Sequence, residues 1–83
     1  MKNRVYLLLE PTQGNAERLA DILRRLPGVL MADILDEPAP KIMMIIEAGG
    51  KRELGSYLSH AIASVDTLTE DLRLLVPREA AVS

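Results

Sequence analysis

The chain of 83 residues contains no cysteine, no phenylalanine and no tryptophan, and it has a single histidine. The absence of cysteine excludes disulfide bonds, cysteine zinc sites and cysteine nucleophiles. Tyr6 and Tyr57 are the only aromatic residues, so aliphatic side chains and methionine must build the core. Because 48% of the residues are hydrophobic, the composition is typical of a folded domain and excludes an intrinsically disordered chain.

Long apolar runs are missing as well. No run approaches the roughly 18 apolar residues that a membrane-spanning helix needs. The apolar run at residues 5–9 is also too short for the core of a signal peptide, and a strand explains it better. We therefore expect a cytoplasmic protein that does not enter a membrane.

Positive charge is not concentrated in any segment. The ten lysines and arginines are scattered along the chain, and the formal net charge is −2. DNA-binding modules usually gather basic residues on one face. We therefore expect no direct nucleic-acid binding by this chain.

The spacing of apolar residues predicts four strands and two helices. Strands are expected where apolar residues run almost continuously, and helices where they recur every three or four residues. The predicted strands are residues 5–9, 29–35, 42–46 and 72–76. One helix should begin near Ala16 and end before Pro27-Gly28, and the other should span residues 51–63. Residues 65–69 should form a connection of partly extended character.

The order β-α-β-β-α-β predicts an α+β fold, the ferredoxin-like sandwich, with an antiparallel sheet and both helices on one face. We expect residues 1–77 to form this single domain and residues 78–83 to form a flexible tail. The first strand is apolar on both sides, because Tyr6 and Leu8 alternate with Leu7 and Leu9. A sheet with one solvated face should instead alternate polar and apolar residues. We therefore expect the second face to pack on another chain, as a homodimer or a larger homo-oligomer.

The loop at residues 36–41 is the most unusual polar feature. Two prolines brace its charged residues beside an apolar strand, which suits a ligand or partner site, although an exposed hairpin turn has the same composition. The candidate ligand-binding residues are Asp33, Asp36, Glu37 and Lys41. Their carboxylates fit no calcium loop, because a loop centred on glycine is absent. We predict no metal and no cofactor.

The sequence offers little for catalysis. His60 falls off the apolar stripe of the second predicted helix, as a solvated residue would. No serine lies in a Gly-x-Ser-x-Gly elbow. Gly49-Gly50 ahead of a basic helix start could hold an anion on free amides, but a plain turn between strand and helix explains it better. We therefore predict no catalytic residue and no enzyme.

Several segments together resemble a known family. They are the strand VYLLLE, a glycine near position 14, the step LADILRRLPGV, the strand end IIEA, and the spacing of Leu54, Tyr57 and Ile62. Over about residues 4–76 the chain resembles the stand-alone effector-binding (RAM) domain of the Lrp/AsnC transcription regulators. The resemblance implies a non-enzymatic regulatory module that oligomerises through its sheet and binds a small effector such as an amino acid. The loop at residues 36–41 lacks the Gly-x-Tyr-Asp signature of that family, so only its position corresponds.

A second resemblance gives an alternative. The stretch DEPAPKIMMIIEA at residues 36–48 is similar to the loop and strand of NapD-type cytoplasmic chaperones, which serve a molybdenum oxidoreductase, the periplasmic nitrate reductase. This resemblance implies the same fold and a twin-arginine signal peptide bound on the open sheet. Asp33, Asp36 and Glu37 would then meet the arginines. The last strand, LRLLVP, lacks the Tyr-His ending common in that family.

Overall fold

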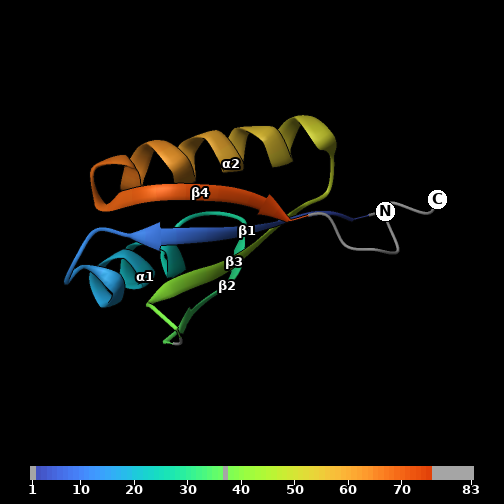
Figure 1. Cartoon of the computed structure of the whole chain (residues 1–83). Helices are drawn as coiled ribbons and strands as arrows, with labels where there is room; N and C mark the ends of the chain where they lie inside the picture. The colour runs from blue at the N-terminus through green and yellow to red at the C-terminus, as the bar shows by residue number, and fades with distance from the viewer. Residues whose placement is uncertain (1, 37, 76–83) are drawn as a thin grey trace.

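A computed structural model describes residues 2–36 and 38–75. The elements follow the order β-α-β-β-α-β, with a short 3-10 helix before the last strand (Figure 1). They are β1 (Asn3–Pro11), α1 (Ala16–Arg24), β2 (Val29–Leu35), β3 (Lys41–Ala48), α2 (Lys51–Val65), η1 (Asp66–Leu68) and β4 (Thr69–Leu75). The predicted ferredoxin-like α+β fold is confirmed. The predicted tail at residues 78–83 and Val76, which we placed in the last strand, lie outside the described residues.

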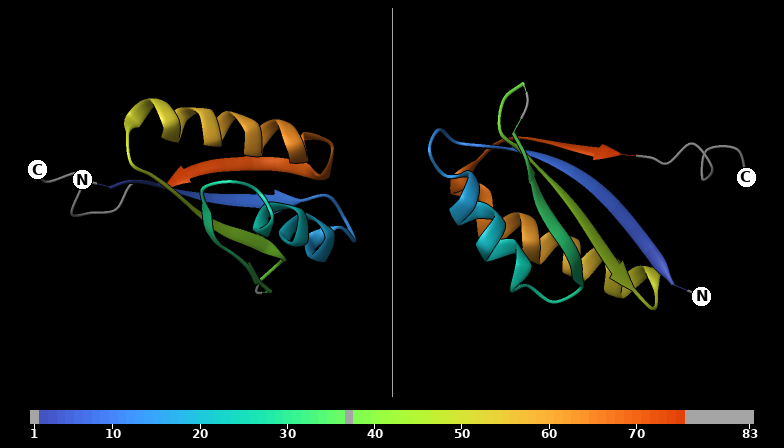
Figure 2. Two further views of the ribbon diagram at one scale, coloured as in Figure 1. Left: turned by 180° about the vertical axis from the view of Figure 1, so that it is seen from behind. Right: turned by 90° about the horizontal axis from the view of Figure 1, so that it is seen from below.

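The four strands form one sheet in the order β2-β3-β1-β4, and every neighbouring pair is antiparallel. β3 and β1 are therefore the central strands, and β2 and β4 form the two edges. The arrangement of strands and helices can be followed from two further sides in Figure 2. Register shifts occur between Val29 and Met31 and between Glu10 and Pro11.

The core lies between the helices and one face of the sheet. Burial alternates at every residue of β3, as a strand covered on one side requires. The fully enclosed strand residues are Leu7, Leu9, Ala32, Ile42, Met44 and Ile46, and the helices contribute Leu19, Ala20, Leu23, Ala61 and Val65. Because α1 and α2 pack into this same cluster, both helices cover the same face of the sheet.

The first helix ends before Pro27-Gly28 as predicted, whereas the end predicted for the second helix is wrong. α1 ends at Arg24, and the next two amides make i→i−3 bonds, Arg25 N–H to Ile22 O and Leu26 N–H to Leu23 O. This tighter turn completes the helix ahead of Pro27, which cannot continue it. At the other helix, the predicted end at residue 63 is too early. Val65 lies one turn beyond Ala61 and is buried with it, so α2 continues to Val65, and η1 replaces the expected extended connection.

Candidate functional site: the uncovered face of the sheet

Side chains on the sheet face opposite the helices form an apolar patch in the centre of that face. Register places Met43 of β3 opposite Leu8 of β1, and Ile45 opposite Tyr6. The row of Ile45 and Tyr6 continues to Met31 on β2 and to Leu75 on β4. It therefore crosses the whole sheet. The six residues that we call the apolar patch are Met31, Met43, Ile45, Tyr6, Leu8 and Leu75. Each is only half-buried, because no described helix covers this face.

Charged residues border the apolar patch at both ends of the central strands and on both edge strands, and the exposed Leu35 of β2 lies beside Lys41 at one corner. The row of Met43 and Leu8 ends at Asp33 on β2 and at Arg73 on β4. The other charged residues of this face are Arg4 and Glu47 at one end of the central strands and Lys41, Glu10 and Asp71 at the other. We call these seven residues the charged rim. An apolar centre enclosed by a polar rim is the usual composition of a protein interaction surface.

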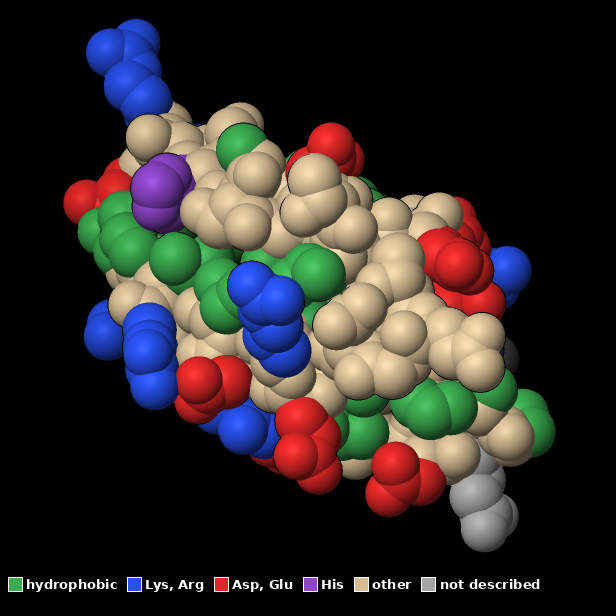
Figure 3. Space-filling model, turned by 90° about the vertical axis from the view of Figure 1, so that its left-hand side faces the viewer, with side chains coloured by type: hydrophobic (Ala, Val, Ile, Leu, Met, Phe, Trp, Pro, Cys, Tyr) green, Lys and Arg blue, Asp and Glu red, His purple; other side chains and the backbone are tan. Residues whose placement is uncertain are grey.

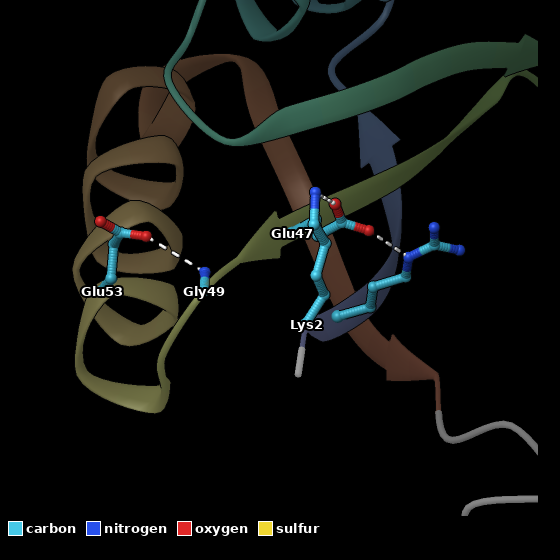
Figure 4. A network of polar contacts seen from close by, with 5 residues as sticks. Lys2, Glu47, Gly49 and Glu53 are labelled. Atoms are coloured by element: carbon cyan, nitrogen blue, oxygen red, sulfur yellow. Dashed lines mark hydrogen bonds and ion pairs between the residues drawn. The ribbon is translucent and has the colours of Figure 1, made fainter.

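One corner of the rim is already neutralised within the chain (Figure 4). The Nε of Arg4 donates to Oε2 of Glu47 at 2.5 Å, and Nζ of Lys2 lies 3.3 Å from its Oε1. The Glu47 side chain is only 11% exposed. The hydrogen bond from Arg4 lowers the pKa of Glu47, and burial opposes that effect more weakly. The same bond raises the pKa of the Arg4 guanidinium above its ordinary value.

The predicted ligand-binding residues are divided between two places. Asp33 and Lys41 both belong to the charged rim, and the side chain of Asp33 is 60% exposed, with Oδ1 3.9 Å from Nη2 of Arg24. Asp36 instead lines a cavity of about 430 Å³, and neither Asp33 nor Lys41 reaches it. Glu37 lies outside the described residues. The structure therefore does not gather the predicted residues into one pocket, and their role in binding stays a prediction.

The cavity lies between the β1–α1 connection and the loop that precedes β3. Its lining mixes apolar and polar residues. The residues are Glu10, Pro11, Thr12, Gln13, Gly14, Ala16, Glu17, Ile34, Asp36, Ala39 and Pro40. Its volume falls within the usual range for small-molecule sites, which is roughly 300–1,000 Å³. The 36–41 loop thus borders a real hollow, on a different part of the molecule from the apolar patch.

The residues considered for catalysis or anion binding have ordinary structural roles. His60 is exposed on α2, and its carbonyl accepts a hydrogen bond from Ser64 Oγ at 2.7 Å. The Gly49 amide, one of those considered for an anion, donates to Glu53 Oε1 at 3.2 Å (Figure 4). A carboxylate of the chain thus occupies the place of the anion. Among residues 2–36 and 38–75, no three histidine or acidic side chains come together in a way that would hold a metal ion.

Two general surface properties complete the description. On the side of the molecule in Figure 3, basic and acidic side chains are interspersed and form no continuous patch of one sign. Within the described part of the chain, none of the helices combines the length and the apolar character needed to cross a bilayer.

The rim residues that sequence reasoning missed are Arg4, Glu10, Glu47, Asp71 and Arg73. They are ordinary charged residues in strands, and they gain meaning only from their neighbours across the sheet. The apolar character of Tyr6 and Leu8, by contrast, was visible in the sequence and did indicate a second face that needs a cover.

Comparisons with known proteins identify the fold and no family. No family model matches the sequence, and no curated protein matches it. The chain is similar to the solution structure of NapD, a Tat proofreading chaperone from E. coli, with a TM-score of 0.68 and 16% identity over 93% of this chain and 78% of that chain. A hypothetical protein from Pyrococcus horikoshii has a TM-score of 0.68 and 14% identity, over 94% of this chain and 93% of the other.

A third similar structure is an enzyme candidate. This protein from Chloroflexus aurantiacus J-10-fl, assigned to the antibiotic biosynthesis monooxygenases, has a TM-score of 0.59 and 20% identity over 93% of each chain. At such identities the likeness establishes a shared ferredoxin-like fold alone, and one fold serves many functions. The comparisons give no sequence-level support for the Lrp/AsnC resemblance in particular. The chain is therefore a ferredoxin-like domain, and among the residues that the structure describes no helix covers the amphipathic second face of its sheet.

Proposed function

We propose that this chain is a non-catalytic chaperone module of the NapD type, which binds a twin-arginine signal peptide in the cytoplasm on the uncovered face of its sheet. The observation behind the proposal is the apolar patch, which crosses all four strands on the face without helices. The structural similarity to NapD, a Tat proofreading chaperone, supports the same choice of partner.

The chemistry of a signal peptide matches this face in two respects. Such a peptide joins a positively charged segment to an apolar segment of 7–15 residues. The apolar segment would pack on the patch, where Met31 and Met43 provide flexible side chains that adapt to different sequences. Guanidinium groups bind carboxylates through charge-assisted hydrogen bonds. The exposed acids of the rim, Asp33, Glu10 and Asp71, would receive them.

Peptide titration by calorimetry tests the proposal. The probe is a synthetic peptide with two adjacent arginines followed by an apolar segment, and the comparison is the same peptide with two lysines. We expect saturable binding of the arginine peptide. The lysine peptide should bind more weakly, because lysine lacks the planar guanidinium group that can bind a carboxylate through two hydrogen bonds. Failure of the wild-type protein to bind the arginine peptide would refute the proposed function.

A matched pair of variants locates the site. Met43→Gln introduces a polar group of similar size into the apolar patch, and we expect it to weaken peptide binding by about 10-fold. Leu74→Gln changes a residue that is 56% exposed but faces the helix side of β4, opposite Leu7. This control should bind the peptide as the wild type does. Equal losses in the two variants would mean that the peptide binds elsewhere.

The 430 Å³ cavity supports a second candidate function, a regulatory module that binds a small effector. Asp36 lines this cavity and would pair with an ammonium group such as that of an amino acid. A thermal-shift screen of the twenty amino acids tests this candidate. A rise in Tm for one of them that disappears in Asp36→Asn would favour the effector-binding module over the chaperone.

A further inference from the structure

The charges on the uncovered face are arranged so that the face is complementary to itself. Along one row, Asp33 lies opposite Met43, Met43 opposite Leu8, and Leu8 opposite Arg73. The row therefore begins with an acid on edge strand β2 and ends with a base on edge strand β4. Its two central positions are apolar.

The central strands repeat this opposition of charge. At one end of the β1–β3 ladder, acidic Glu47 on β3 lies opposite basic Arg4 on β1. At the other end, beyond the last ladder pair, basic Lys41 on β3 and acidic Glu10 on β1 follow and line the same small hollow. In each of these rows the charge on the β2–β3 half is therefore opposite to the charge on the β1–β4 half.

If two copies of the chain are related by a two-fold axis parallel to their strands, opposite charges on the two copies face each other. When two such faces meet, the axis brings β2 of one copy against β4 of the other, and β3 against β1. Asp33 then faces Arg73 of the second copy. Glu47 faces Arg4 in the same way, and Lys41 faces Glu10. The apolar rows also match, since Met43 meets Leu8 and Ile45 meets Tyr6.

The usual geometry of packed sheets permits these pairs. Two sheets stack about 10 Å apart with their strands about 30° from parallel. This rotation displaces the edge strands by about 4 Å relative to the central axis. The side chains of Arg73 and Lys41 are long enough to span such an offset. A dimer with two-fold symmetry repeats each contact, so every ion pair occurs twice.

We propose that the uncovered face pairs with a second copy of this chain through a two-fold axis parallel to the strands, and that the dimer masks the peptide-binding surface until a peptide displaces it. The masking rests on the proposed function. The dimer itself rests only on the charge pattern and the apolar patch.

Charge reversal at the two edge positions tests the dimer in the chain of 83 residues. Both Asp33 and Arg73 are exposed on edge strands, where folding tolerates substitution. Light scattering after size exclusion should show the wild type as a dimer at high protein concentration. Asp33→Arg places two arginines at each edge contact, and Arg73→Asp places two aspartates there. Each single variant should therefore remain monomeric at concentrations where the wild type is a dimer.

Mixing the two single variants gives the sharpest outcome. In a heterodimer, Arg at position 33 of one variant faces Asp at position 73 of the other, and the remaining contact pairs Arg73 with Asp33. Both contacts are then attractive, so the equimolar mixture should recover the dimer mass. A wild type that stays monomeric at all concentrations would overturn the dimer. If each variant is monomeric and their mixture also stays monomeric, the proposed orientation of the two-fold axis is wrong.

A further variant and a titration separate the remaining effects. Arg24→Gln breaks the contact that Asp33 makes within the chain and should leave the dimer mass unchanged. Addition of the twin-arginine peptide to the wild type should convert the dimer to a monomer that holds the peptide. Peptide bound to an intact dimer would overturn the masking. The monomeric Arg73→Asp variant keeps all three exposed acids of the rim, so if the peptide does not bind even this variant, the proposed function fails and the dimer stands.

Discussion

The ring of Tyr57 on α2 lies directly against the backbone of Gly28, in the turn between α1 and β2. A Cβ atom at Gly28 would stand 2.8 Å from Cγ of the ring and closer still to Cδ2. The Gly28 carbonyl also accepts the backbone amide of Glu47 at 2.8 Å. One residue therefore joins α2, the α1–β2 turn and β3.

Gly28→Ala should destabilise the protein by about 3 kcal/mol, since the new side chain combines a left-handed backbone with a clash against a packed ring. Gly28 has φ +82°. Gly14 is the matched control, because its φ is also +82° but nothing lies within 4 Å of the added Cβ. Gly14→Ala should cost only about 1 kcal/mol. Urea unfolding measures both losses, and equal losses would show that the ring contact is unimportant.

The Arg4–Glu47 pair predicts a specific pH dependence. The pKa of Glu47 is lowered in the folded protein from its ordinary value of 4.5. The pair therefore stabilises the fold fully above that ordinary value, and the contribution is lost as pH falls through the lower pKa of the folded state.

Urea unfolding of Glu47→Gln between pH 7 and pH 3 measures this dependence. The variant should be less stable than the wild type near neutral pH, and the difference should shrink as the solution becomes more acidic. Glu70→Gln, which removes an exposed carboxylate from β4, controls for the loss of one charge. A difference between wild type and Glu47→Gln that stays constant with pH would be inconsistent with the pairing.

Arg24 connects the last turn of α1 to the edge strand β2. Its Nε donates to the carbonyl of Ala32 at 2.8 Å. Arg24→Met should therefore destabilise the protein by about 1–2 kcal/mol, because the Ala32 carbonyl loses a hydrogen bond from a charged donor. The neighbouring Arg25 forms an exposed i,i+4 pair with Asp21 at 3.1 Å, and Arg25→Met should cost about 0.4 kcal/mol. Thermal unfolding compares the two, and the reverse order of losses would argue against the edge contact.

Much of the fold was predictable because burial in this chain follows simple periodicity. The continuous apolar residues at 42–46 predicted a strand, and β3 forms there, between β1 and β2. The i, i+3, i+4 spacing likewise predicted both helices. The end of α2 was missed because Val65 continues the apolar stripe that runs from Leu54 to Ala61, and a packed valine outweighed the apparent strand character of the residues after it.

The candidate surface was only partly predictable. The sequence indicated that both faces of the strands are apolar, and Leu8 and Leu9 do lie on opposite faces. It did not indicate that Asp33 and Arg73 end the same row, because that relationship depends on register across residues 40 apart and on a shift between Val29 and Met31. A register that slips by one residue moves every side chain to the other face. Sequence alone therefore revealed the composition of the surface but not its order.

The most direct test of the account is a map of where a twin-arginine signal peptide binds. Backbone amide chemical shifts of the isotope-labelled wild-type protein, followed during a peptide titration, report this residue by residue. The account predicts saturable changes centred on Leu8, Met43 and Ile45, with smaller changes along α1 and α2. Changes confined to the helices or to the cavity beside Asp36, or no changes at all, would contradict peptide binding on the uncovered face of the sheet.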